Sequence, residues 1–285
     1  MLSAPARVLI RSRGSTRKGL VNIGSEVRSE SDSILVTDPK QRFSGHAEYY
    51  AKYRPSYPYS VLEYMERELG FSAKSLVADA GSGTGIFAEM LAQNGNRVFG
   101  IEPNDEMRKI AEANLSSNRN FTSIKGSAEA TTLPATSVDF ITAAQSFHWF
   151  DHAKARQEFR RILREKGWVI LLWNTRLTNT SFLEAYDRMI KGSTVERRGI
   201  KHEDITEELL SSFLGKYRSV ELSNFQECDE AALKGRVLSA SYVPLPGDPS
   251  YARLVESLGE LFRQYEVGGR VRFEYLTELY AGQLG

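Results

Sequence analysis

Cysteine, histidine and long apolar runs are all scarce in this chain. Cys228 is the only cysteine in 285 residues, which excludes an internal disulfide framework and is typical of a reducing compartment. The four histidines show no metal-ligand spacing, so no metal site is predicted. No run approaches the ~20 apolar residues that span a bilayer. These absences predict a cytoplasmic protein without a membrane span.

The body of the chain also lacks an excess of basic residues. The 37 Lys and Arg residues nearly balance the 36 Asp and Glu residues, for a net charge of +1. Residues 1–25 hold five of the basic side chains and none of the acidic ones, so the remainder is net negative. Such a surface would not attract a phosphate backbone, which argues against a nucleic-acid partner. The basic leader is either an N-terminal extension of a cytoplasmic protein or a transit peptide for an organelle matrix.

Short apolar strands alternate with amphipathic helices from residue 58 to residue 174. This alternation predicts right-handed βαβ units and a parallel sheet. The helix after the fourth strand is expected to end at Gly167. The predicted strands of this part are 75–80, 97–101, 121–125, 138–144 and 168–173. Beyond it we expect helices within 178–215, over 231–240 and over 251–265, and strands over 219–225 and 271–277.

A glycine-rich turn separates the first strand from its helix. Gly81, Gly83 and Gly85 allow a tight turn and a close approach of a ligand to the backbone. Glu102 is placed at the end of the second strand, where a carboxylate can accept both hydroxyls of a ribose. The dinucleotide pattern Gly-x-Gly-x-x-Gly requires its third glycine where Ile86 stands. The spacing therefore favours a nucleoside ligand other than a dinucleotide.

Three segments together carry a resemblance to a known family. Val77-Ala-Asp-Ala-Gly-Ser-Gly-Thr-Gly85, Ile101-Glu-Pro-Asn104 and Gly126-Ser-Ala-Glu129 resemble the motifs of class I S-adenosylmethionine-dependent methyltransferases. The resemblance covers about residues 46–174 and is similar to the small-molecule branch with the ubiquinone/menaquinone and trans-aconitate methyltransferases. It implies S-adenosylmethionine as cofactor, a small-molecule methyl acceptor, and a monomer or homodimer.

The resemblance also implies the architecture. We expect an α/β fold: a doubly wound, mostly parallel, seven-stranded Rossmann-like sheet with an antiparallel C-terminal strand and a helical cap. Residues 1–40 would be disordered or extended, and 41–285 would form the methyltransferase domain. Within that domain, 41–176 would be the cofactor-binding half, and 177–285 the acceptor cap with the C-terminal strands. Four aromatic residues would form an acceptor cap or be ordinary core: Phe182, Tyr186, Phe213 and Tyr242.

Cofactor contacts carry over from the resemblance to individual positions. Glu102 would hold the ribose, and the segment 127–129 would reach the adenine edge. An Asp is commoner in the family where Ser127 stands, so Ser127, the Ala128 backbone and Glu129 all remain open as the adenine contact. The predicted cofactor-binding residues are Tyr50, Arg54, Asp79, Gly81, Ser82, Gly83, Gly85, Glu102, Pro103, Asn104, Met107, Ser127, Ala128, Glu129 and Gln145.

The acceptor is expected beyond the fourth strand, which ends in Ala143-Ala-Gln-Ser-Phe-His-Trp-Phe150. This is not the Asn/Asp-Pro-Pro-Tyr signature of amide and adenine methylation. His148 is the predicted catalytic base, because histidine titrates nearest neutrality; a structural role in an aromatic cluster is the alternative. Upstream, the segment from His46 to Pro58 resembles the N-terminal lid of the family. The resemblance implies that Tyr50 closes over the cofactor and that Arg54 pairs with its carboxylate; an ordinary surface helix is the alternative.

Three other functions fit the same pattern. The chain could be an NAD-dependent oxidoreductase, against which the displaced third glycine argues. It could bind the cofactor without chemistry, or use the cofactor's positive charge for a cyclisation. The glycines and the acid of the motif are all in place, so methyl transfer to a small molecule is the predicted function.

Overall fold

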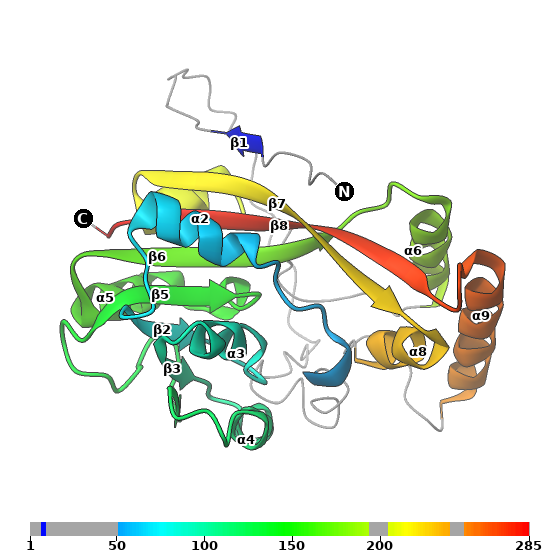
Figure 1. Ribbon diagram of the computed structural model, residues 1–285, viewed down its shortest axis with the longest axis horizontal. Helices are drawn as coiled ribbons and strands as arrows, with labels where there is room; N and C mark the ends of the chain where they lie inside the picture. Colours follow the sequence, from blue (N-terminus) through cyan, green and yellow to red (C-terminus); the bar gives the residue numbers. More distant parts are fainter. Residues whose placement is uncertain (1–6, 10–50, 194–204, 240–247, 285) are drawn as a thin grey trace, which may run out of the picture.

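The computed structural model describes residues 7–9, 51–193, 205–239 and 248–284. Strands and helices alternate along most of this part of the chain (Figure 1). The strands are β1 (Arg7–Leu9), β2 (Leu76–Ala80), β3 (Arg97–Ile101), β4 (Phe121–Ile124), β5 (Val138–Ala144), β6 (Leu163–Arg176), β7 (Tyr217–Cys228) and β8 (Val271–Gly282). The helices are α2 (Ser60–Leu69), α3 (Ile86–Gln93), α4 (Asp105–Asn114), η1 (Phe147–Trp149), α5 (His152–Ile162), α6 (Ser181–Ser193), α7 (Glu207–Leu214), α8 (Glu230–Leu238) and α9 (Pro249–Tyr265).

All of these strands form one sheet, in the order β1-β7-β8-β6-β5-β2-β3-β4. The five strands from β4 to β6 in that order pair in parallel. β8 runs antiparallel to both β6 and β7. The predicted doubly wound, mostly parallel sheet with an antiparallel C-terminal strand is therefore confirmed. The three-residue β1 adds an antiparallel edge strand that the sequence pattern does not predict.

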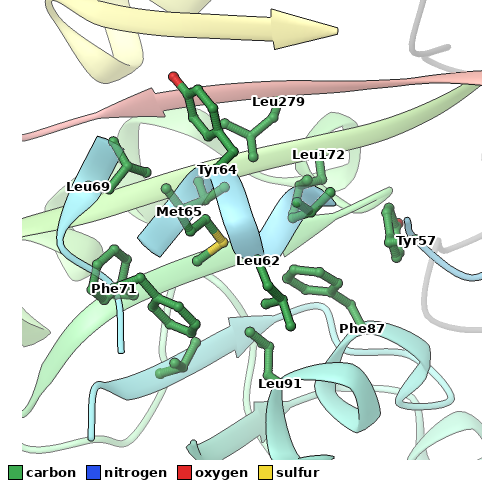
Figure 2. Packing of buried hydrophobic residues seen from close by; sticks show 14 of the residues in the cluster. Tyr57, Leu62, Tyr64, Met65, Leu69, Phe71, Phe87, Leu91, Leu172 and Leu279 are labelled. Atoms are coloured by element: carbon green, nitrogen blue, oxygen red, sulfur yellow. The ribbon is translucent and has the colours of Figure 1, made fainter. Parts of the chain in front are cut away.

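One face of the sheet is covered by α2 and α3. Leu62 and Met65 from α2 meet Phe87 and Leu91 from α3 above Leu172 of β6 (Figure 2). The apolar stripe of α2 therefore faces the sheet as its periodicity predicts, and each fully buried side chain of this size stabilises the fold by about 1.5–3 kcal/mol. Figure 2 shows these side chains pointing toward one another between helix and strand.

The opposite face is covered by α5 and α7. Phe159 and Ile162 of α5 pack with Phe213 of α7 and with Phe147, which follows β5. The rings of Phe147 and Phe213 meet edge to face with 4.7 Å between their centroids. This aromatic cluster holds the segment after β5 against the sheet.

One helix prediction needs correction. α5 ends at Ile162 rather than at Gly167, because Leu163 is already part of β6 and is buried against the same cluster. Gly167 lies inside β6, where a side chain would come within 2.7 Å of the Asp139 carbonyl oxygen. The helices expected within 178–215 are α6 and α7, and residues 194–204 between them lie outside the described part.

A helical cap lies beyond the carboxyl ends of the parallel strands, as expected. α6, α8 and α9 gather there around the extended parts of β7 and β8 (Figure 1). Their shared core includes Leu233 of α8, Leu258 of α9 and Phe273 of β8. Among the described residues, no helix combines the length and the apolar character needed to cross a membrane.

Candidate active site

The glycine loop between β2 and α3 adopts the backbone that only glycine takes easily. Gly81, Gly83 and Gly85 have φ values of 67°, 57° and 87°. A Cβ on Gly81 would lie 2.6 Å from the Cβ of Ser146, and one on Gly85 would lie 3.0 Å from the side chain of Leu115. A Cβ on Gly83 would meet no atom within 4 Å. The first and third glycines therefore serve packing, whereas Gly83 faces open space.

Glu102 connects this loop to the next helix. Its Oε2 accepts a hydrogen bond from the Gly83 backbone N–H at 2.9 Å, and its Oε1 accepts one from the Asn104 N–H at 2.8 Å. The residue directly follows β3, as predicted, and is only 7% exposed. Burial raises the pKa of its carboxyl, and the two hydrogen bonds partly oppose that shift.

The residues after Glu102 begin α4. Asn104 caps the helix, as its sequence position predicts: its Oδ1 accepts hydrogen bonds from the N–H groups of Glu106 and Met107. Met107 is buried on the first turn, and Pro103 is half-buried before the cap. Ser82 lies in the facing glycine loop, where its N–H donates to the Ile101 carbonyl. The predicted residues of these two loops are thus brought together.

Asp79 is a buried acid at the carboxyl end of β2. Its Oδ1 accepts a hydrogen bond from Thr142 Oγ1 at 2.6 Å, whereas its Oδ2 is buried without a hydrogen-bond partner. The residue is 1% exposed, and this burial raises the pKa of its carboxyl to about 7. The neighbouring Glu102 carboxylate raises it further, against the effect of the Thr142 hydrogen bond.

The segment 127–129 turns back toward the start of α5. Ser127 and Ala130 form an isolated bridge, which leaves Ala128 buried between them. Glu129 Oε1 accepts a hydrogen bond from the Asp151 N–H at 2.8 Å. This hydrogen bond gives the Glu129 carboxylate a structural role at the start of α5. Ser127 and the Ala128 backbone, which do not have this role, stay the preferred predictions for the contact with the adenine edge.

The tip of β5 carries a strained residue. Gln145 has a φ of 58°, a left-handed conformation that costs a non-glycine residue about 1–3 kcal/mol. Its N–H donates to the Leu172 carbonyl at 2.9 Å, and its Nε2 donates to the Asn174 carbonyl at 3.3 Å. These bonds to β6 hold the strained turn in place, and such strain is concentrated at functional sites.

Ser146 is a positioning residue that the sequence reasoning missed. Its Oγ donates to the Ala80 carbonyl at 2.7 Å, which ties the tip of β5 to the end of β2 just before the glycine loop. The only sequence signal for this role is the small side chain that the close approach to Gly81 requires. Thr142, the partner of Asp79, was also not predicted, because nothing in the sequence distinguishes it from the other residues of its strand.

His148 lies on η1, directly after this tip. It is partly exposed, and its ring is tilted against that of Trp149 with 4.8 Å between the centroids. Phe147, by contrast, is fully buried in the aromatic cluster under α5. His148 is thus partly exposed, although its Nδ1 is buried, whereas Phe147 belongs to the core. A catalytic His148 stays a prediction.

The described part of the predicted N-terminal lid, residues 51–58, contacts the cap through Tyr53 and Arg54. Arg54 Nη2 donates to the Ser239 carbonyl at the end of α8, at 3.4 Å. The Tyr53 ring lies so close to Gly235 of α8 that a Cβ there would be 2.2 Å away. Arg54 is thus positioned by α8, and its pairing with a cofactor carboxylate stays a prediction. Tyr50 lies outside the described residues.

The four aromatic residues considered for the acceptor cap do not form one group. Phe182 and Tyr186 are buried in the core of the cap, within 5.1 Å of the Phe273 ring. Phe213 belongs to the cluster on the other face of the main sheet. Tyr242 lies outside the described residues. The ordinary-core alternative therefore holds for the three that can be placed.

The comparisons with known proteins place a methyltransferase domain in this chain. Residues 78–171 match the family model described as a methyltransferase domain, which spans the loops and strand ends above. An uncharacterized methyltransferase of Mycobacterium tuberculosis is 35% identical over 127 residues, covering 45% of this chain and 49% of that protein. A Saccharomyces cerevisiae protein named probable S-adenosylmethionine-dependent methyltransferase is 28% identical over 188 residues, covering 64% of each. The chain spans about half the length of the first of these relatives.

Solved structures agree on the fold. An Anaeromyxobacter dehalogenans protein described as a candidate type II methyltransferase superposes with a TM-score of 0.62 at 21% identity, covering 81% of this chain and 98% of that one. An Anabaena variabilis protein, described as a candidate methyltransferase from an antibiotic biosynthesis pathway, gives a TM-score of 0.53 at 20% identity, covering 82% and 99%. The chain therefore shares the Rossmann-like fold of these two structures.

Proposed function

We propose that this protein transfers the methyl group of S-adenosylmethionine to a small-molecule acceptor. The observation that carries the proposal is the loop geometry: Gly83 faces open space beside Glu102, at the carboxyl ends of β2 and β3 within the matched domain. Parallel α/β sheets bind their ligands at this edge. The net negative charge outside the N-terminal segment supports a small acceptor rather than a nucleic acid.

Two features of the site fit this cofactor in particular. The third glycine, Gly85, directly precedes Ile86, the first residue of α3, and packs against Ala111 of α4. It therefore stands one residue before the position that the dinucleotide pattern requires. Asp79 and Glu102 place two buried acids beside the loop, and one carboxylate oxygen of Asp79 has no protein partner. A ligand with hydroxyl groups and a positive charge complements such a site.

Each group of residues then has a distinct task. The carboxylate of Glu102 accepts hydrogen bonds from the ribose, Asn104 and Met107 lie beside the adenine, and Gly83 leaves room for the ligand. When bound, S-adenosylmethionine supplies an activated methyl group. Gln145 and Ser146 hold the tip of β5 against the glycine loop, and His148 orients the acceptor or takes its proton.

Ligand binding to the full-length chain tests the proposal. Calorimetry should detect S-adenosylhomocysteine at one site per chain and should detect no binding of NADH. Incubation with S-adenosylmethionine labelled in its methyl group and a small-molecule extract should then transfer label to a compound that passes a size filter. Binding of NADH without S-adenosylhomocysteine would overturn the proposal, and cofactor binding without transfer to any acceptor would favour a non-catalytic binder.

A further inference from the structure

Polar side chains continue beyond the tip of β5 along one face of the three neighbouring strands. Residues directly opposite one another in a sheet point to the same face. The opposed pairs here are Asn174 with Thr277, Arg176 with Tyr275, Asn224 with Tyr275, and Gln226 with Phe273. α8 lies beside the same strand ends (Figure 1). This face therefore runs from the predicted acceptor region into the cap.

Arg236 of α8 places a buried positive charge on this face. The residue is only 8% exposed, and its guanidinium lies 4.5 Å from the centre of the Phe273 ring and 5.3 Å from that of Tyr275. Nη1 donates to Gln226 Oε1 at 3.2 Å, whereas Nε is buried without a hydrogen-bond partner. Within the described ranges no carboxylate forms an ion pair with it. A buried charge without a counter-ion is costly, so a function must account for it.

Tyr275 adds a hydrogen-bond donor next to this charge. Its side chain is 2% exposed, and its Oη is buried without a partner. Burial raises the pKa of the phenol to about 12, so it remains protonated and can donate a hydrogen bond at neutral pH. Two buried donors without acceptors, the Nε of Arg236 and the Oη of Tyr275, thus belong to side chains in contact.

The second arginine of this face is already neutralised. Arg176 Nη2 forms an ion pair with Asp187 at 2.8 Å, and its guanidinium lies over the Tyr186 ring. Of these two arginines, Arg236 is therefore the one that has no acidic partner among the described residues. One unit of charge with planar donors matches a carboxylate better than a doubly charged phosphate.

We propose that Arg236 and Tyr275 bind a carboxylate group of the methyl acceptor. The proposal rests on the proposed function, which it deepens by naming the substrate class. The carboxylate would lie away from the reacting atom. The Asn174 carbonyl accepts a hydrogen bond from Gln145 at the tip of β5, and Tyr275 lies opposite Arg176, which is two residues, or about 7 Å, further along β6. The acceptor is accordingly a carboxylic acid whose methylated atom lies several bonds from the carboxylate, with Phe273 and Tyr275 beside its apolar part.

The test uses the full-length chain and two matched pairs of probes. Benzoate and hexanoate carry a carboxylate on an apolar body, and benzamide and hexanamide have the same shape without the charge. At millimolar concentration, at least one of the two acids should raise the midpoint of thermal unfolding of the unmodified protein, and its amide should not. Arg236→Met should lose this shift. The control Arg272→Met should keep it, since Arg272 is an exposed arginine of β8 that stacks on Phe225 at 4.0 Å.

Two further measurements separate this proposal from its alternatives. Arg236→Met should bind S-adenosylhomocysteine within about twofold of the unmodified protein, so failure of the cofactor assignment would be seen independently. Without ligand, this variant should melt at a higher temperature, because an unpaired buried charge is removed. If Arg236→Met does not fold, Tyr275→Phe, which removes only the Oη donor, should reduce the acid-specific shift. Equal shifts with acid and amide, no shift with either acid, or an unchanged shift in both variants would overturn the proposal.

Discussion

The two halves of the molecule bury ionisable side chains of opposite kinds, acids in the first half and an arginine in the second. Among the described residues, the charged side chains that are buried before residue 176 are Asp79 and Glu102, whereas the one buried after it is Arg236. The buried atoms without a hydrogen-bond partner include Asp79 Oδ2 in the first half and Arg236 Nε in the second. Under the two proposals made above, this difference gives the first half a ligand with a positive charge and hydroxyl groups, and the second half an anion.

The two halves also differ in how they position their groups. The first half uses backbone: glycine φ angles, the N–H groups that hold Glu102, and the cap on α4. The second half uses side chains packed on a sheet face, with Arg236 between Gln226 and two aromatic rings. Backbone-built sites leave motifs in a sequence, whereas sites built from side chains of distant strands do not.

The largest expected effect concerns the glycine loop of the first half. Gly83→Val should abolish binding of S-adenosylhomocysteine, because the branched side chain would fill the open space beside Glu102. Calorimetry measures this. The control is Gly268→Val: Gly268 has a similar φ of 61° and open surroundings, but lies in the turn between α9 and β8. This control carries the same backbone strain and should keep full affinity. Unchanged affinity in a folded Gly83→Val protein would remove the loop from the cofactor site.

The second prediction concerns the junction of the halves. His148→Asn should lower turnover by roughly 10²–10⁴-fold if the imidazole acts as a base, and should leave cofactor affinity within about twofold. The rate of the unmodified enzyme should fall at low pH with one ionisation that the variant lacks. Steady-state kinetics over a pH series, with calorimetry alongside, checks both statements. Parallel loss of stability and cofactor binding, at an unchanged rate per bound site, would show that His148 is structural.

The third prediction concerns Glu102, one of the two buried acids of the first half. Glu102→Ala should weaken the cofactor by about 1.5–3 kcal/mol, the range for hydrogen bonds to a charged group, which is roughly 10–150-fold in Kd. The variant also leaves the Gly83 and Asn104 N–H groups without their acceptor. A 2′-deoxy analogue of S-adenosylhomocysteine, tested on the unmodified protein, isolates the ribose contact. If it binds as tightly as the parent compound, Glu102 does not hold that hydroxyl.

The smallest expected effect concerns pH and stability. Because burial raises the pKa of Asp79 from 3.8 to about 7, the native state holds a proton there that the unfolded chain releases. Its contribution to stability is present below about pH 4 and is lost as the pH rises through about 7. Asp79→Asn should therefore lose less stability than the unmodified protein between about pH 5 and pH 8.

Thermal unfolding at the two pH values measures this difference. Asp105→Asn is the control, because Arg108 and Lys125 lower the pKa of the Asp105 carboxyl and keep it ionised over this range. That variant should show the same loss as the unmodified protein. Equal losses for all three proteins would mean that Asp79 is ionised in the native state throughout, which would sharpen its case as a partner for a positive charge.

Local sequence patterns were sufficient for most of the first half. The alternation of strands and helices, the glycine loop and the cap at Asn104 were all predictable, because each depends on neighbours within one or two turns of the chain. The antiparallel last strand was expected only from the family resemblance, because its direction depends on pairing with the distant strands β6 and β7. The end of α5 at Ile162 was not, since the pattern of Phe159, Ile162 and Leu163 fits a helix as well as a helix that turns directly into a strand.

Tertiary structure alone decided the contacts between distant segments. Ser146 meets Ala80 across 66 positions, and Thr142 meets Asp79 across 63. Arg236 reads in the sequence as a polar residue of a short surface helix, but the packing of α8 on β7 and β8 buries it over Phe273. By itself the sequence determined the elements and the cofactor loop, because local backbone preferences act along the chain. Which side chains meet at the sheet ends depended on how those elements pack, since strand pairing joins residues that no local pattern connects.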